Sequence, residues 1–228
     1  MNFYDEWECC LLNNKDDRYY INSFLYKTVD SIVPLEKSSK KQIKKIIEFL
    51  LAYNKQRIID MINDDHIKLM MPYDIAQFSN FEKSTNEITH ILKYEPNGLT
   101  FEELGYLLNS SSNKLAATKY GENQSKTARI FSFVTFTNSK PTIVKNTSLG
   151  NEFPLLNKED QDRLISILSL RDPMIKCFIA SAKTKNVKYE DIICCLSETT
   201  TIRRKTNVHT LLSKSLVDND NILKKIII

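Results

Sequence analysis

Glycine is scarce in this 228-residue chain, which contains only four, and proline occurs six times. Four scattered glycines cannot form the glycine-rich loop that surrounds the phosphates of a bound nucleotide. No Asp or Glu is followed two positions later by Lys, so the chain lacks the D/E-x-K motif with which a restriction-type nuclease binds Mg²⁺. The G-x-S-x-G and HExxH motifs are missing as well. These absences favour a protein without catalytic activity, and they leave open a divergent nuclease whose acids meet only in the fold.

Long hydrophobic runs are also missing. Apolar stretches such as residues 46–51 are interrupted by charge well before the ~20 residues that a membrane helix needs. Residues 1–7 are acidic, whereas a signal peptide begins with basic residues. We therefore expect a cytoplasmic protein with no membrane partner.

Cysteine and histidine are too few and too dispersed to suggest a metal site. Of the five cysteines, Cys9–Cys10 and Cys194–Cys195 are adjacent pairs and Cys177 stands alone, which suits neither a disulfide framework nor a zinc knuckle. We expect reduced, mostly buried thiols. The only cluster of acids with an imidazole is Asp64–His66, and we predict neither a metal nor a cofactor.

The chain is typical of a folded protein, with 42% hydrophobic and 26% charged residues. Apolar residues recur at about every 3.6 positions over residues 43–62, which predicts one long amphipathic helix that ends before Met71-Pro72-Tyr73. The fold class is therefore mainly α. We expect a helical N-terminal segment over residues 1–72, a winged-helix domain over 73–155 and a second, helix-turn-helix-like domain over 156–228.

Two S/T-x-x-E sequences predict helix starts in the middle of the chain. Ser84 with Glu87, and Thr100 with Glu103, fit the capping box. The first helix should stop at residues 96–98 and the second at residues 109–112, as in a helix-turn-helix.

A third helix and a hairpin should follow. We expect a short helix that begins just past Gly121, because a residue without a Cβ lets the chain turn sharply and bring its amides close to a phosphate. The β-prone runs 133–136 and 142–145, joined by residues 137–141, predict the hairpin. Three helices followed by a hairpin is the order of a winged helix, whose third helix enters the major groove.

Positive charge gathers in this region. Residues 114–145 hold six basic side chains and one acid, Glu122, so the window carries +5. Asn123 and Gln124 suit adenine, and Lys126 and Arg129 suit guanine or phosphate. The predicted DNA-binding side chains of this region are Lys119, Asn123, Gln124, Lys126, Thr127 and Arg129 on the helix and Lys140 and Lys145 on the hairpin.

The remainder of the chain is predicted to be helical. Asn157 can cap a helix over residues 158–170, Pro173 suits the first turn of a helix over 172–182, and residues 189–196 form a short third helix. The last helix should cover residues 202–216. Basic residues near its start oppose the helix dipole, which an anionic ligand or plain solvation would explain; they are Arg203, Arg204 and Lys205.

These motifs together resemble a known family. The matching stretches are residues 99–105, 119–123, 126–128 and 147–150, and the segment LSETTTIRRKTNVHT at 196–210. They are similar to winged helix-turn-helix modules of prokaryotic proteins associated with restriction-modification systems. The resemblance implies double-stranded DNA binding, as a restriction-associated specificity subunit or a transcriptional regulator, with a separate nuclease or methyltransferase chain as a further partner. A homodimer is compatible with it.

A helical protein-interaction module is the alternative. Winged helices also serve in assembly, and the acidic N-terminal segment, with Trp7, Tyr19 and Tyr20, could dock a partner protein. Salt-dependent retention on duplex DNA separates the two hypotheses.

Overall fold

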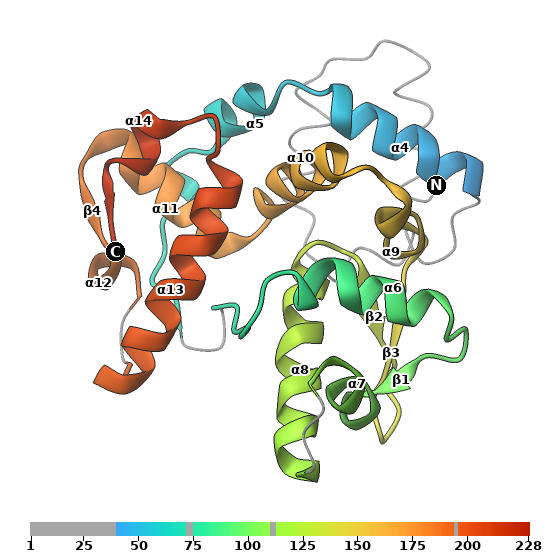
Figure 1. Ribbon diagram of the computed structural model, residues 1–228. Helices are drawn as coiled ribbons and strands as arrows, with labels where there is room; N and C mark the ends of the chain where they lie inside the picture. Colours follow the sequence, from blue (N-terminus) through green and yellow to red (C-terminus); the bar gives the residue numbers. More distant parts are fainter. Residues whose placement is uncertain (1–39, 72–74, 110–112, 194–195) are drawn as a thin grey trace.

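A computed structural model describes residues 40–71, 75–109, 113–193 and 196–228 of the chain (Figure 1). The fold is mainly helical, as the sequence predicts. Several predicted features lie outside the described residues: Trp7, Tyr19, Tyr20, Pro72, Tyr73 and the four paired cysteines. Cys177, which is described, is a free and buried thiol.

The predicted long helix is two helices. α4 covers Lys40–Ala52 and α5 covers Lys55–Met61. Asn54 lies in an extended conformation between them and caps α5, with its side-chain oxygen accepting a hydrogen bond from the Gln56 backbone nitrogen at 3.0 Å. The apolar face is as expected, since Ile43 and Ile62 are fully buried. A short 3₁₀ helix, η2 (Asp64–His66), follows.

The middle of the chain forms helices around a small antiparallel sheet. A π-helix, η4 (Lys83–Glu87), runs directly into α6 (Ile88–Lys93). The elements that follow are β1 (Leu99–Thr100), α7 (Phe101–Leu108), α8 (Lys114–Ile130), β2 (Val134–Phe136) and β3 (Ile143–Asn146). The strand order is β1-β3-β2, with Val144 opposite both Leu99 and Phe136. The hairpin of β2 and β3 confirms the predicted one, and β1 is a further strand that the sequence did not predict.

Only one of the two predicted capping boxes forms. The Thr100 hydroxyl accepts from the Glu103 backbone nitrogen at 3.2 Å, and the Glu103 carboxylate accepts from the Thr100 nitrogen at 2.8 Å. Ser84, by contrast, is buried inside the π-helix, where its hydroxyl donates to the Asn80 carbonyl and accepts from the Gln124 amide. A helical segment does begin here, at Lys83, but the capping box predicted at Ser84 does not form, because other contacts occupy its hydroxyl.

The predicted start of the third helix was also wrong. α8 is 17 residues long and begins at Lys114, where Asn113 is the cap. Gly121 lies in its middle and packs against the backbone of α7. It therefore provides neither a turn nor a phosphate-binding loop.

The four helices predicted in the last third of the chain occur in the predicted order. The third is shorter than predicted, and the last begins at Glu198 and not at residue 202, so residues 203–205 lie in its second turn. α9 (Ser148–Glu152) and η5 (Phe153–Leu155) lead into the remaining helices and strands. These are α10 (Lys158–Ser169), α11 (Pro173–Thr184), β4 (Val187–Lys188), α12 (Tyr189–Ile192), α13 (Glu198–Ser215), α14 (Asp220–Leu223) and β5 (Ile226–Ile227). β4 and β5 pair in parallel. Asn157 caps α10 and Pro173 lies in the first turn of α11, as expected, and Asp172 is the cap of α11.

One contiguous cluster of buried apolar side chains joins these elements, and it extends from Ile43 to Ile226. α10 packs against both α4 and α13, so it links the N-terminal helices to the C-terminal ones. α8 and α13 both point toward the lower end of the molecule in Figure 1, at a distance from each other. The division into three segments stays a prediction.

None of the described helices is both long and apolar enough to span a membrane.

Candidate nucleic-acid interface

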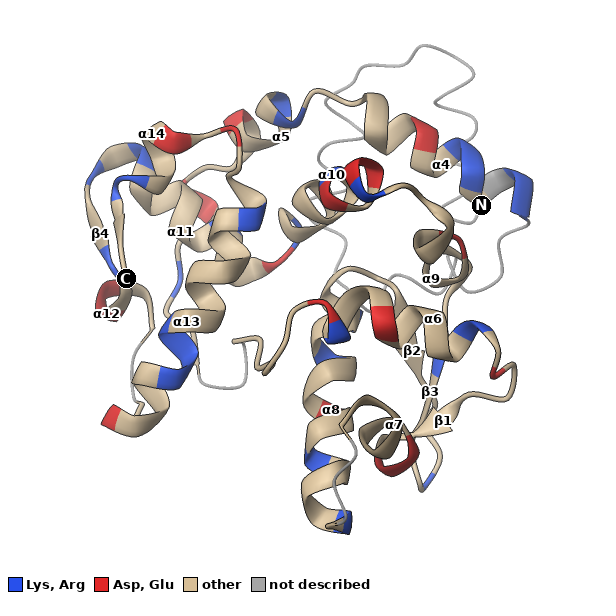
Figure 2. Cartoon of the chain, in the orientation of Figure 1, with Lys and Arg blue, Asp and Glu red and all other residues tan. Residues whose placement is uncertain are grey.

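One face of α8 lines a groove of about 940 Å³. Its lining residues on α8 are spaced mostly three or four positions apart, as neighbours on one helix face are; they are Lys119, Glu122, Asn123, Lys126, Arg129 and Ile130. The hairpin contributes Phe136, Thr137, Asn138 and Thr142. The opposite wall comes from residues 75–77 and from Arg204 on α13. Figure 2 shows basic residues on both helices that border the groove.

The α8 face carries an ion-paired triad. The Glu122 carboxylate lies 2.6 Å from Lys126 Nζ and 3.2 Å from Lys119 Nζ. The hydrogen bond from Lys126 holds the pKa of Glu122 below its ordinary value of 4.5, against the opposing effect of burial. The two lysine side chains remain 59% and 67% exposed, whereas that of Glu122 is 23% exposed. Both cations can therefore reach a ligand in the groove.

Arg129 is oriented by an aromatic ring. Its guanidinium carbon lies 5.0 Å from the centroid of the Phe136 ring, within the range of a cation–π interaction. Phe136 in turn meets Phe101 edge-on, with their centroids 5.5 Å apart. The hairpin thus holds the planar donor fork of Arg129 at the groove, and such a fork suits phosphate or guanine.

Arg204 borders the groove and also holds together the wall opposite α8. It donates to the Ile75 carbonyl at 2.7 Å and to Gln77 Oε1 at 3.2 Å. Burial lowers the pKa of its guanidinium. From the α8 side, the Thr127 hydroxyl donates to the Gln77 carbonyl at 3.4 Å. Residues 75–77 are therefore held from both helices.

Two of the predicted contact residues are structural. Gln124 is 1% exposed, and its amide is engaged by Ser84 and, at 2.9 Å, by Ser79. Thr127 is fully buried. The prediction that these side chains contact DNA was wrong, because both point into the packing between α8 and the segment that precedes η4.

Four other predicted residues do not line the groove. Lys140 is exposed at the tip of the hairpin. Lys145 pairs with Thr135 and so faces away from Phe136, because side chains alternate along a strand. Lys205 pairs with Glu190 at 2.6 Å. Arg203, which is exposed, donates back to the Thr199 carbonyl at 3.4 Å. The structure therefore brings together Lys119, Asn123, Lys126, Arg129 and Arg204 and leaves these four outside.

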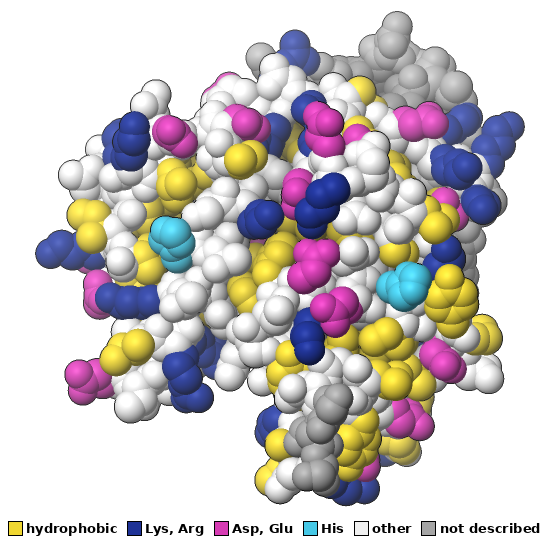
Figure 3. All heavy atoms as spheres, in the orientation of Figure 1, with side chains coloured by type: hydrophobic (Ala, Val, Ile, Leu, Met, Phe, Trp, Pro, Cys, Tyr) yellow, Lys and Arg dark blue, Asp and Glu magenta, His cyan; other side chains and the backbone are white. Residues whose placement is uncertain are grey.

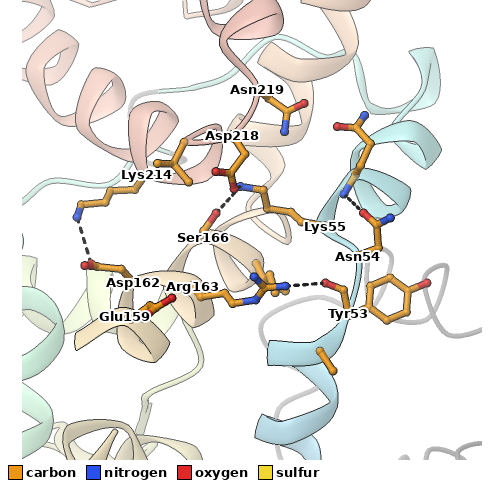
Figure 4. Close-up of a pocket in the computed structure, with 14 residues that line it drawn as sticks. Tyr53, Asn54, Lys55, Glu159, Asp162, Arg163, Ser166, Lys214, Asp218 and Asn219 are labelled. Atoms are coloured by element: carbon orange, nitrogen blue, oxygen red, sulfur yellow. Dashed lines mark hydrogen bonds and ion pairs between the residues drawn. The ribbon is translucent and has the colours of Figure 1, made fainter. Parts of the chain in front are cut away.

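A second cavity of about 640 Å³ lies among α5, α10 and the end of α13 (Figure 4). Lys55 Nζ donates to Ser166 Oγ at 2.8 Å and pairs with Asp218 at 3.1 Å, and Lys214 pairs with Asp162 at 3.2 Å. Three basic and three acidic side chains line this cavity, whereas four basic and two acidic ones line the α8 groove. The α8 groove is therefore the better site for a polyanion.

The partners that shape the groove were not predicted from the sequence. In the sequence, Glu122 entered only the net charge of residues 114–145. Its spacing to Lys119 and Lys126 is nevertheless that of ion pairs on a helix. Residues 75–77 were not predicted either, since their position depends on contacts with α13 more than 120 positions away. No local signal marks that segment.

Within the described part of the chain, no three His, Cys, Asp or Glu side chains come close enough to hold a metal ion. Comparison with known protein families, curated proteins and solved structures finds no significant match to this chain.

Proposed function

We propose that this chain binds double-stranded DNA through the α8 groove, without catalysis and without a cofactor. The order α6, β1, α7, α8 and hairpin is the order of elements in a winged helix. In that arrangement α8 enters the major groove, and the hairpin tip with Lys140 lies against the backbone. The proposal includes a cytoplasmic location.

The side chains have distinct roles in this proposal. Lys119 and Lys126 contact phosphates and set the register of the protein on the duplex. Asn123 and Arg129 read base edges, since an amide suits adenine and a guanidinium suits guanine. The sequence resemblance supports a specificity subunit of a restriction system or a transcriptional regulator, and a nuclease or methyltransferase chain would then act beside it.

The observation that carries the proposal is the gathering of Lys119, Asn123, Lys126 and Arg129 on one face of one helix, beside a hairpin. The test is a salt titration of duplex binding by the variant K126A/R129A. Its slope of log K against log salt should be shallower than that of the parent by about 0.9 for each phosphate that the variant no longer neutralises. The control K41A/K44A removes two exposed lysines from α4, away from the groove, with the same change in net charge.

Two results would contradict the proposal: equal affinity and slope for K126A/R129A and the parent, or equal reductions in K126A/R129A and K41A/K44A. The first would mean that α8 does not meet the duplex. The second would mean that only total charge matters.

A protein-interaction module is the second candidate function, and exposed apolar side chains favour it. Leu107 is 59% exposed and Leu115 is 71% exposed, near the point where α7 leads into α8. Figure 3 shows hydrophobic side chains gathered at this end of the molecule. Self-association through this surface, measured by analytical ultracentrifugation, should disappear in L107S/L115S and persist in K126A/R129A.

A further inference from the structure

Glu122 occupies an unexpected place for an acid in a surface that meets DNA. It lies on the same face of α8 as Lys119, Asn123 and Lys126, and it lines the groove with them. A carboxylate at this point repels the phosphates that the lysines attract. Its hydrogen bonds with both lysines also compete with phosphate, since each lysine must leave Glu122 or share its donors in order to bind the backbone.

We propose that Glu122 is a specificity-determining residue that weakens the binding of duplex DNA of arbitrary sequence. This inference rests on the proposed function. Specificity is a difference between affinities, and a repulsive element that weakens the wrong complexes increases it. Every duplex offers phosphates, whatever its sequence, and Glu122 reduces the free energy of binding that comes from phosphate contacts. A cognate duplex also meets Asn123 and Arg129 at its base edges, and Glu122 leaves those interactions intact.

The packing of Glu122 fits this role better than that of a flexible surface acid. Its side chain is 23% exposed, and lysines from the preceding and the following turn hold its carboxylate. The carboxylate therefore stays at the groove, where an incoming duplex meets it. Glu102, which pairs with Lys114 at 3.0 Å between α7 and the start of α8, does not line the groove.

The test compares E122Q with the parent on a duplex of arbitrary sequence over a range of salt concentrations. Glutamine keeps the shape of the side chain and removes its charge. At low salt E122Q should bind this duplex about three- to tenfold more tightly, a range that two exposed ion pairs of ordinary strength allow. The slope of log K against log salt should steepen by up to about one, because one negative charge no longer offsets the phosphate contacts of the two lysines.

The matched control is E190Q. It makes the same change in net charge and releases Lys205, whose partner is Glu190 at 2.6 Å, outside the groove. If E190Q tightens binding as much as E122Q does, the effect is one of total charge and the inference is wrong. If E122Q binds no more tightly than the parent, the inference is also wrong.

A selection from randomised duplexes measures specificity itself. The parent should recover a narrower set of sequences than E122Q does, and equally narrow sets would overturn the inference. Failure of the proposed function has a different signature, because the parent, E122Q and E190Q would then all lack salt-dependent binding, and both proposals would be rejected together. Binding by the parent with no change in E122Q rejects the inference alone.

Discussion

Gly105 and Gly121 meet where α7 packs against α8: a Cβ on Gly121 would lie 2.9 Å from the backbone nitrogen of Gly105 and 1.9 Å from the Phe101 carbonyl oxygen. A Cβ on Gly105 would lie 1.8 Å from the carbonyl oxygen of Ala117. The two backbones touch with no side chain between them. This packing fixes how far α8 stands from α7, and with it the position of the face that carries Lys119 and Lys126.

We expect G121A to destabilise the protein by about 1–3 kcal/mol, the usual cost of overpacking. Helix propensity alone predicts the opposite sign, since alanine in a helix interior is favoured over glycine by about 1 kcal/mol. The free energy of unfolding from urea titration checks the sign. The control T118A changes a partly exposed position on the same helix. Equal or greater stability of G121A would contradict the close packing of α7 against α8.

The position of Gly121 shows what a sequence cannot predict by itself. A glycine before a polar stretch is consistent with a turn or with a helix–helix contact, and only the position of α7 decides between them. The same holds for Gln124 and Thr127, whose burial depends on Ser79, Ser84 and Gln77, some 40 to 50 residues earlier.

Local signals were more informative. Asn157 and Pro173 predicted the starts of α10 and α11, because a cap and a first-turn proline act within a few residues of themselves. β-prone residues and turn chemistry likewise predicted the hairpin of β2 and β3. The break at Asn54 was not predicted because the apolar spacing continues through it. Among the residues that line the groove, the sequence therefore predicted the cations of α8 and Arg204 but not residues 75–77, which complete the wall opposite α8.

The Thr100 capping box gives a second prediction. T100A should lower the free energy of unfolding by about 1 kcal/mol, because the Glu103 amide loses its acceptor at the start of α7. T100S, which keeps the hydroxyl, should recover most of that stability. Equal stability of T100A and T100S in urea titrations would show that the cap does not stabilise α7.

The same box makes stability depend on pH. Hydrogen bonds from the Thr100 backbone and hydroxyl hold the pKa of Glu103 below its ordinary value of 4.5. A carboxylate whose pKa is lower in the folded state stabilises the fold above the unfolded pKa, and this contribution is lost as pH falls through the folded value. E103Q should therefore be less stable than the parent at neutral pH, and the difference should shrink below pH 4.5.

Urea titrations of the parent and of E103Q at a series of pH values check this. E87Q, which removes an exposed carboxylate elsewhere, serves as the control. A difference between E103Q and the parent that stays constant from neutral to acid pH would contradict the assigned cause.

Neighbouring arginines on α13 should behave differently. R204A removes the donors that hold Ile75 and Gln77, and the carbonyl of Ile75 loses a hydrogen bond from a charged group, which costs about 1.5–3 kcal/mol. R203A removes an exposed side chain whose hydrogen bond goes to the Thr199 carbonyl of the same helix, at 3.4 Å. The melting temperature of R203A should therefore match that of the parent. Equal melting temperatures for R204A and R203A would mean that Arg204 does not hold residues 75–77 against α13.

Phe136 offers a way to separate orientation from charge in DNA binding. F136L keeps an apolar side chain on β2 and removes the ring over which the Arg129 guanidinium lies. Arg129 keeps its charge, and the phosphate contacts of Lys119 and Lys126 are unaltered, so the slope of log K against log salt should not change. The affinity should nevertheless fall by about 0.5–2 kcal/mol, the strength of a cation–π interaction, because the guanidinium is no longer held in place before binding. R129A removes the base contact and also a positive charge near the phosphates, so it should reduce both affinity and slope. A changed slope in F136L, or an unchanged affinity, would contradict the orienting role of the ring.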